Sequence, residues 1–183
     1  MIPYLARLLD MTINNGVLPA DWKRVVVVPI HKGSDRSLVT NYRPVSLTSV
    51  VCKQMEHVTA SYLRKAWDKN DWLYEGQNGF RSGYSCGSQV ITVCQNSAES
   101  RDKGDRIDAT LTDFSKVFNL DPDDWLLMKI AISRVDSRVL AWVRELFLGH
   151  TQRVKVGGQF SEEVRVTSVV LQGIVLLPLL FLA

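Results

Sequence analysis

Residues 107–113 constrain the fold more than any other segment because apolar and polar side chains alternate strictly along them. Apolar residues take every second position (Ile107, Ala109 and Leu111), and polar residues lie between them (Asp108, Thr110 and Thr112). A period of two predicts a β-strand with one face toward a core. Asp113 continues the apolar face at the end of this strand. A carboxylate in that position needs an ion pair, a hydrogen bond or a metal ion.

The rest of the sequence mixes helical and strand-like segments. The β-branched run 24–30 predicts a strand that leads into a turn at residues 32–35. Residues 153–156 and 164–166 flank Gly157-Gly158 and predict a hairpin with a longish loop. Four apolar stripes have helical spacing and are interpreted as core faces: residues 2–13 with a stop at Asn15-Gly16, residues 51–67, residues 86–98, and residues 139–147 ending at Gly149. The expected fold class is therefore α+β.

Positive charge is concentrated in the first part of the chain. Residues 1–106 hold 14 of the 22 Lys and Arg residues but only 10 of the 19 Asp and Glu residues. Such a surface could neutralise phosphates, and it could equally keep the chain soluble. Three scattered cysteines predict no disulfide-linked partner and suit an intracellular compartment, cytoplasm or nucleus. The apolar stretch 169–183 is shorter than a membrane helix, so no membrane association is predicted.

Asp113 has two physical interpretations. An inward carboxylate at a strand end can bind a hard cation such as Mg²⁺, which prefers oxygen ligands and often takes only one or two carboxylates. Alternatively, Asp113 caps the following segment or pairs with Lys116. A single carboxylate does not make a two-metal site, so position alone leaves both interpretations open.

Several blocks together resemble the reverse transcriptase domain of non-LTR retrotransposons, the LINE and jockey-like mobile elements. The segment LTDFSKVFN (111–119) is similar to the first catalytic motif of that family. Residues 22–58, with NYRPVSL at 41–47, resemble its opening fingers blocks, and GQNGFRSGYSC (76–86) resembles the next one. HTQRVKVGGQFSEEVRVTS (150–168) and the Gln172-Gly173 stretch follow in the same order. The resemblance covers essentially the whole chain.

The resemblance implies a two-metal nucleotidyl transfer site. Asp113 matches the aspartate that binds both Mg²⁺ ions, and Phe114 matches the position whose backbone carbonyl adds a ligand. Phe118 matches the aromatic residue that excludes a ribose 2′-hydroxyl, although a core Phe would look the same in sequence. Gln172 and Gly173 match the segment beneath the template and the incoming base pair. The implied partners are an RNA template, a DNA primer and a deoxynucleotide.

Two arginines complete the implied site. Arg81 lies in a block that resembles a region contacting the triphosphate and the template, and guanidinium groups suit phosphate oxygens. Arg43 contacts the template or instead braces the fingers through hydrogen bonds. The resemblance implies fingers over residues 1–106 and an incomplete palm over residues 107–183, as parts of a right-hand polymerase.

The sequence also departs from the family pattern. Asn119 replaces an Asp, Asn78 replaces a His, and Asp123-Asp124 replaces a His and a basic residue. Val169 and Leu177 replace glycines, which would strain the backbone by about 1 kcal/mol or more if those sites require positive φ. Scattered losses of this kind are typical of a decaying element.

The family's second catalytic aspartate hairpin and its thumb would follow the last residue of this chain. We therefore expect an inactive enzyme and an exposed apolar tail, residues 169–183, that promotes aggregation. The sequence leaves three hypotheses: a reverse transcriptase read only in part, a catalytically dead module that binds RNA or DNA, and a relic with no selected function.

Overall fold

The computed structural model describes residues 2–112, 123–166 and 173–182, and it has the expected α+β composition. Its elements in chain order are α1 (Ile2–Asn15), η1 (Ala20–Lys23), β1 (Arg24–His31), η2 (Val39–Asn41), β2 (Tyr42–Leu47), α2 (Val50–Lys69), α3 (Cys86–Asp102), α4 (Asp123–Ile132), α5 (Ser137–Phe147), β3 (Thr151–Val156), β4 (Gln159–Phe160), β5 (Val164–Arg165) and α6 (Leu177–Leu180).

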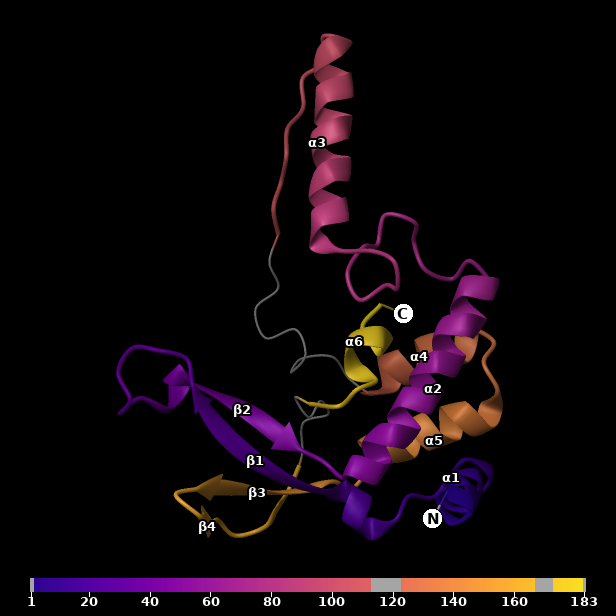
Figure 1. Cartoon of the computed structure of the whole chain (residues 1–183), viewed down its shortest axis with the longest axis vertical. Coiled ribbons are helices and arrows are strands. Elements are labelled where there is room, and N and C mark those ends of the chain that lie inside the picture. Colours follow the sequence, from indigo (N-terminus) through magenta and orange to yellow (C-terminus); the bar gives the residue numbers. More distant parts are fainter. Residues whose placement is uncertain (1, 113–122, 167–172, 183) are drawn as a thin grey trace.

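The strands form one sheet in the order β2-β1-β3-β4, with β5 paired to β3 (Figure 1). Strand β1 confirms the strand expected at residues 24–30, and the turn after it contains Gly33 with φ +117°. Strand β2 is antiparallel to β1, whereas β3 is parallel to β1. The sheet therefore joins chain segments from both sides of the proposed boundary at residue 106.

The hairpin expected around Gly157-Gly158 is present but tighter than predicted. Val156 pairs with Gln159, so the two glycines alone form the turn, and both have positive φ. A two-residue turn of this conformation is readily formed by glycine. The predicted second strand also exists, because β5 pairs antiparallel with β3 farther along the sheet. The intervening strand β4 was not predicted.

Helices α1, α2, α4 and α5 form the body of the molecule beside the sheet (Figure 1). Helix α5 buries the stripe that was predicted from its spacing: Val139, Trp142, Val143, Leu146 and Phe147. In the core, the Trp67 indole N–H of α2 donates a hydrogen bond of 2.8 Å to the Ser133 hydroxyl. Helix α1 ends at Asn15, and Gly16 follows with φ +61°, as the sequence indicated.

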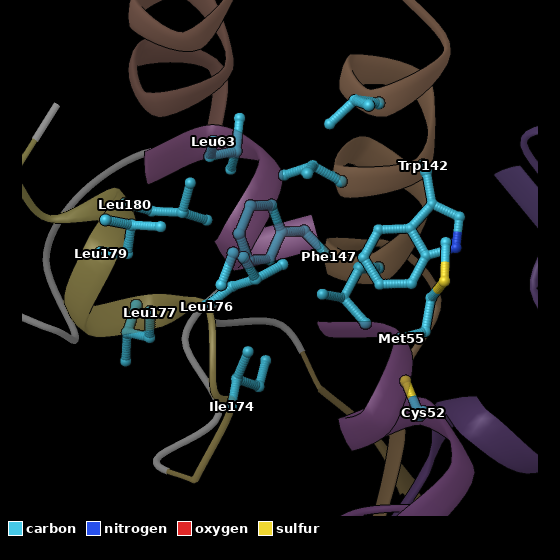
Figure 2. Close-up of a cluster of buried hydrophobic side chains, with 14 of the residues drawn as sticks. Cys52, Met55, Leu63, Trp142, Phe147, Ile174, Leu176, Leu177, Leu179 and Leu180 are labelled. Carbon is cyan, nitrogen blue, oxygen red and sulfur yellow. The ribbon is translucent and has the colours of Figure 1, made fainter. Parts of the chain in front are cut away.

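The apolar segment 174–180 is buried, so the prediction of an exposed tail was wrong for these residues. Ile174, Leu176, Leu177, Leu179 and Leu180 are at most 8% exposed. Figure 2 shows them beside Leu63 of α2 and Phe147 of α5. The helical body of the molecule thus covers these apolar side chains, whereas the sequence analysis expected other parts of the palm to cover them. Leu177 lies in helix α6, so its replacement of glycine causes no positive-φ strain there.

Helix α3 confirms the helix expected at residues 86–98 but not its role as a core face. It has a capping box in which the Ser85 and Ser88 side chains and backbone amides bond reciprocally. None of its residues is buried, and Val90, Ile91 and Val93 are at least half exposed. In Figure 1 it extends away from the other helices. Helical periodicity specifies an apolar stripe, but a stripe is buried only where another element covers it.

Residues 107–112 do not form the expected strand. They have no regular secondary structure, and Leu111 is 98% exposed. A strand requires a neighbour to pair its backbone N–H and C=O groups, and none of the described strands lies in register with this segment. Alternation alone was therefore insufficient here. Asp113 lies outside the described residues.

Candidate functional site

Four of the seven site residues expected from the sequence lie outside the described residues: Asp113, Phe114, Phe118 and Gln172. Gly173, Arg81 and Arg43 are described, and each lies in a different environment. Gly173 is exposed but lies against the backbone of strand β2, Arg81 lies in the long loop between α2 and α3, and Arg43 is exposed on β2.

Gly173 is in close contact with strand β2. Its φ is +129°, and a Cβ added to it would lie 2.5 Å from the backbone oxygen of Ser46. Real Cβ atoms do not approach a backbone oxygen so closely, and L-residues rarely adopt this φ. Because Ser46 belongs to the strand that carries Arg43, the fold brings the NYRPVSL block and Gly173 together.

Glu56 holds the residues that follow Gly173. It is fully buried on α2, and its Oε2 accepts hydrogen bonds from the backbone amides of Val175 at 2.5 Å and Leu176 at 3.3 Å. Burial raises the pKa of the Glu56 carboxyl, although these two amides counteract the effect. Its Oε1 has no hydrogen-bond partner among the described residues. The carboxyl therefore satisfies two backbone donors that would otherwise be buried unpaired.

Cys52 lies one helical turn before Glu56 and is also buried. Burial raises the pKa of the Cys52 thiol to about 12, and the neighbouring Glu56 carboxyl contributes to the same rise. A thiol with such a pKa is almost entirely protonated near neutral pH and is therefore a poor nucleophile or metal ligand. Cys52 serves as part of the apolar core at this position.

Arg81 is held by two contacts within its own loop. Its Nη1 donates a hydrogen bond of 3.1 Å to the backbone carbonyl of Tyr74, and its guanidinium lies 4.9 Å from the centre of the Tyr84 ring. These residues border an open hollow of about 710 Å³ that is also lined by Asp71, Leu73 and Glu75. Arginine has five N–H donors, so most of its donors remain for a ligand in the hollow. The two carboxylates reduce the positive potential there.

Glu56 was not identified as a special residue from the sequence, although a signal exists. It lies on the same helical stripe as Cys52, Thr59 and Leu63, all of which are buried. A carboxylate within an apolar stripe of period 3.6 needs a partner, just as one on the apolar face of a strand does. The partners, two backbone amides 119 and 120 residues later, have no sequence signature.

The described residues contain no group of three or more His, Cys, Asp or Glu side chains that could bind a metal ion. Within the same residues, no helix is sufficiently long and apolar to cross a membrane. The three cysteines are free thiols. The predicted metal ligand, Asp113, is outside this part of the chain, so its role stays a prediction.

Comparison with known proteins identifies the family. The family model described as "Reverse transcriptase (RNA-dependent DNA polymerase)" matches residues 30–183. The chain belongs to the reverse transcriptase family. This match includes strand β2, the Arg81 loop and the segment that Glu56 holds, so these features are parts of a reverse transcriptase domain.

Relatives from Drosophila melanogaster place the domain among LINE-like mobile elements. The probable RNA-directed DNA polymerase from transposon BS is 28% identical over 70% of this chain and 14% of its own length. The corresponding protein of transposon X-element is 24% identical, and that of mobile element jockey is 26% identical, each over 98% of this chain and 20% of the relative. The chain thus spans a fifth or less of the length of these relatives.

Proposed function

We propose that this chain forms the fingers, residues 1–106, and part of the palm, residues 107–183, of an RNA-directed DNA polymerase encoded by a non-LTR retrotransposon. Its substrates would be an RNA template, a DNA primer and a deoxynucleotide. The observation that carries the proposal is the arrangement of Arg81, which is fixed by Tyr74 and Tyr84 beside an open hollow. An arginine held in this way is preorganised to bind phosphate oxygens.

Gly173 supports the same proposal. Its close approach to Ser46 fixes the backbone next to Gln172, which we assign to the surface beneath the template and the incoming base. Glu56 adds a second constraint two residues later through Val175. A surface that supports a base pair must be rigid, and these contacts provide rigidity from the protein interior.

The metal-binding role is assigned to Asp113, with the Phe114 backbone carbonyl as a further ligand and Phe118 as the residue that excludes a 2′-hydroxyl. A carboxylate and a carbonyl are oxygen ligands of the kind that Mg²⁺ prefers. When bound, Mg²⁺ would stabilise the charge that develops on the transferred phosphate. The described residues contain no group of three or more His, Cys, Asp or Glu side chains that could add ligands to these.

A binding experiment tests the proposal. We expect the purified chain to bind an RNA template annealed to a DNA primer more tightly than the unprimed template. Arg81→Ala should weaken this binding about tenfold, because a charge-assisted hydrogen bond to phosphate contributes about 1.5–3 kcal/mol. Arg81→Lys should recover only part of the loss, since an ammonium lacks the planar fork.

Arg101→Ala serves as the matched control. Arg101 is exposed at the end of α3, so its replacement by alanine removes the same charge from a different part of the surface. Equal losses for Arg81→Ala and Arg101→Ala would contradict a specific role for Arg81. Equal affinity for primed and unprimed RNA would contradict the proposed function itself.

A further inference from the structure

An open groove crosses the surface of helix α5, between the end of α1 and helix α4. Both α1 and α4 pack against α5. The groove has a volume of about 720 Å³ and is lined by Gly16 after α1, Leu127 and Met128 of α4, Ala141 and Arg144 of α5, and Leu148 after α5. It shares no lining residue with the hollow beside Arg81, and the proposed polymerase function assigns no role to it.

Apolar side chains are exposed at this groove. Met128 is 49% exposed and Leu148 is 43% exposed, although both line the hollow. Trp125 and Ile132, on the same helix as Met128, are 63% and 59% exposed. These three residues of α4 are spaced by three and four positions, so they lie along one side of the helix. A continuous apolar surface rimmed by polar residues is typical of a site that binds another protein.

The charges at the groove are unbalanced toward the positive sign. Glu145, the acidic residue among those that line the groove, pairs with Lys23 at 2.9 Å. Arg144 in the groove and Lys129 beside Met128 are both exposed, and neither forms an ion pair with a carboxylate that the structure describes. The carboxylate is therefore already neutralised within the chain, whereas the two cations remain available to attract carboxylates of a partner.

The walls and the length of the groove suit an α-helix better than an extended peptide. From Ser137 to Leu148 the groove follows α5 for about 16 Å, at 1.5 Å per residue. A helix that presents apolar residues at positions i, i+3 or i+4, and i+7 needs about 10 Å. The walls are helices, whose backbone groups bond internally. An extended peptide would find no strand edge there for its own N–H and C=O groups, whereas a helix pairs its own.

We propose that this groove binds an acidic amphipathic α-helix of a protein partner. The apolar stripe of that helix packs against Leu127, Met128 and Leu148, and its flanking carboxylates lie near Lys129 and Arg144. The inference goes beyond the proposed polymerase function, because it assigns a contact with a protein to a surface that binds neither template nor nucleotide in that proposal. Apolar burial supplies most of the affinity, and the two cations select the sign of the partner's charge.

Two designed peptides test the sign of the charge. Each is a fluorescein-labelled helix of about 18 residues with leucines at every third or fourth position, long enough to form a helix. The acidic peptide has glutamates on both flanks of the stripe, and the basic peptide has lysines there. Fluorescence anisotropy at low salt should show that the whole chain binds the acidic peptide about tenfold more tightly. The double variant Lys129→Glu with Arg144→Glu should reverse this preference, an outcome that misfolding cannot produce.

A second pair of variants tests the apolar contact. The groove variant Met128→Gln with Leu148→Gln should weaken binding of the acidic peptide about tenfold, because two half-exposed apolar side chains no longer become buried on binding. The control, Val90→Gln with Val93→Gln, changes two similarly exposed residues on α3 and should leave the affinity unchanged.

Three results would overturn the inference. The first is equal affinity of the wild-type chain for the acidic and basic peptides, and the second is an equal loss in the groove variant and the α3 control. The third concerns self-association. If sedimentation velocity showed that the wild-type chain dimerises and that the groove variant remains monomeric, the groove would be an interface between two copies of the chain and not the site of a partner helix.

Discussion

Gly173 lies against the backbone carbonyl of Ser46, with room for a hydrogen atom but not for a methyl group. We expect Gly173→Ala to destabilise the protein by about 2–4 kcal/mol, because a steric overlap with the Ser46 backbone adds to the strain of an L-residue at φ +129°. Urea unfolding measures the change in free energy.

Gly33→Ala separates the two causes. Gly33 has a similar φ of +117°, but a Cβ added there would have no atom within 4 Å. It should therefore show only the backbone effect, about 1 kcal/mol. If both variants were equally destabilised, the contact between Gly173 and Ser46 would make no contribution to the loss of stability.

The Glu56 side chain should be required as a hydrogen-bond acceptor. Glu56→Ala leaves the Val175 and Leu176 amides unpaired and should lower the free energy of unfolding by at least about 2 kcal/mol. Glu56→Gln retains an acceptor oxygen and should remain within about 1 kcal/mol of wild type at neutral pH. Asp68→Asn, an exposed change on the same helix, is the control.

The pH dependence of the free energy of unfolding gives a second test of Glu56. Burial raises its pKa above 4.5, so the folded state binds the proton more tightly than the unfolded state. Wild type should therefore gain stability relative to Glu56→Gln as the pH falls from neutral toward 4.5, and should lose it again as the pH rises through the folded pKa. A constant difference between the two proteins across this range would show that Glu56 titrates as it does when unfolded.

His150 should make the protein sensitive to mild acid. It is 4% exposed, and this burial lowers the pKa of the imidazole below 6.5, although the hydrogen-bond contact of its Nε2 with the Leu146 carbonyl opposes the change. The unfolded state then binds the proton first as the pH falls. Stability should fall with pH below 6.5 by up to about 1.4 kcal/mol per pH unit, until the folded pKa is passed.

His150→Gln should remove this part of the pH dependence, and thermal unfolding of the variant and wild type between pH 7 and 5 measures it. His57→Gln, at an exposed position, is the matched control for the loss of a histidine. The same slope in His150→Gln and wild type would assign the acid sensitivity to other groups.

The three cysteines should differ strongly in reactivity. Cys86 and Cys94 are exposed, whereas Cys52 is 1% exposed and its pKa is raised to about 12. Iodoacetamide near neutral pH should therefore modify Cys86 and Cys94 first and Cys52 much more slowly, because Cys52 is buried and almost entirely protonated at that pH. Mass spectrometry of the native protein gives the order, and guanidinium should make all three react. Rapid modification of Cys52 in the native state would contradict its place in the core.

Local sequence patterns predicted several elements well. The apolar stripes predicted helices α1, α2, α3 and α5, and the β-branched run predicted strand β1. The glycine pair predicted the position of the hairpin turn. These features depend on neighbouring residues, because helical and strand periods follow from backbone geometry. The family assignment likewise came from short motifs in a fixed order, and the family model confirms it over residues 30–183.

The sequence did not predict in the same way which apolar faces are covered by other elements. Helices α3 and α5 were both expected to bury an apolar stripe, but α5 is much more strongly amphipathic than α3, and only the stripe of α5 is covered by neighbouring elements. The apolar segment 174–180 was expected to be exposed and instead packs on α2 and α5. The candidate site follows the same rule: the motifs selected Gly173, but no local pattern indicated its contact with Ser46, or the hydrogen bonds of Glu56 to the amides of Val175 and Leu176.

The sequence by itself therefore determined the family, the periodic elements and the residue types available for chemistry, since each is encoded within a few consecutive positions. The tertiary structure decided which carboxylate was buried and which glycine has no room for a side chain. Those properties depend on partners more than a hundred residues apart, as in Glu56 with Val175 and Gly173 with Ser46. Burial and close packing exist only between elements, so no local pattern contains them.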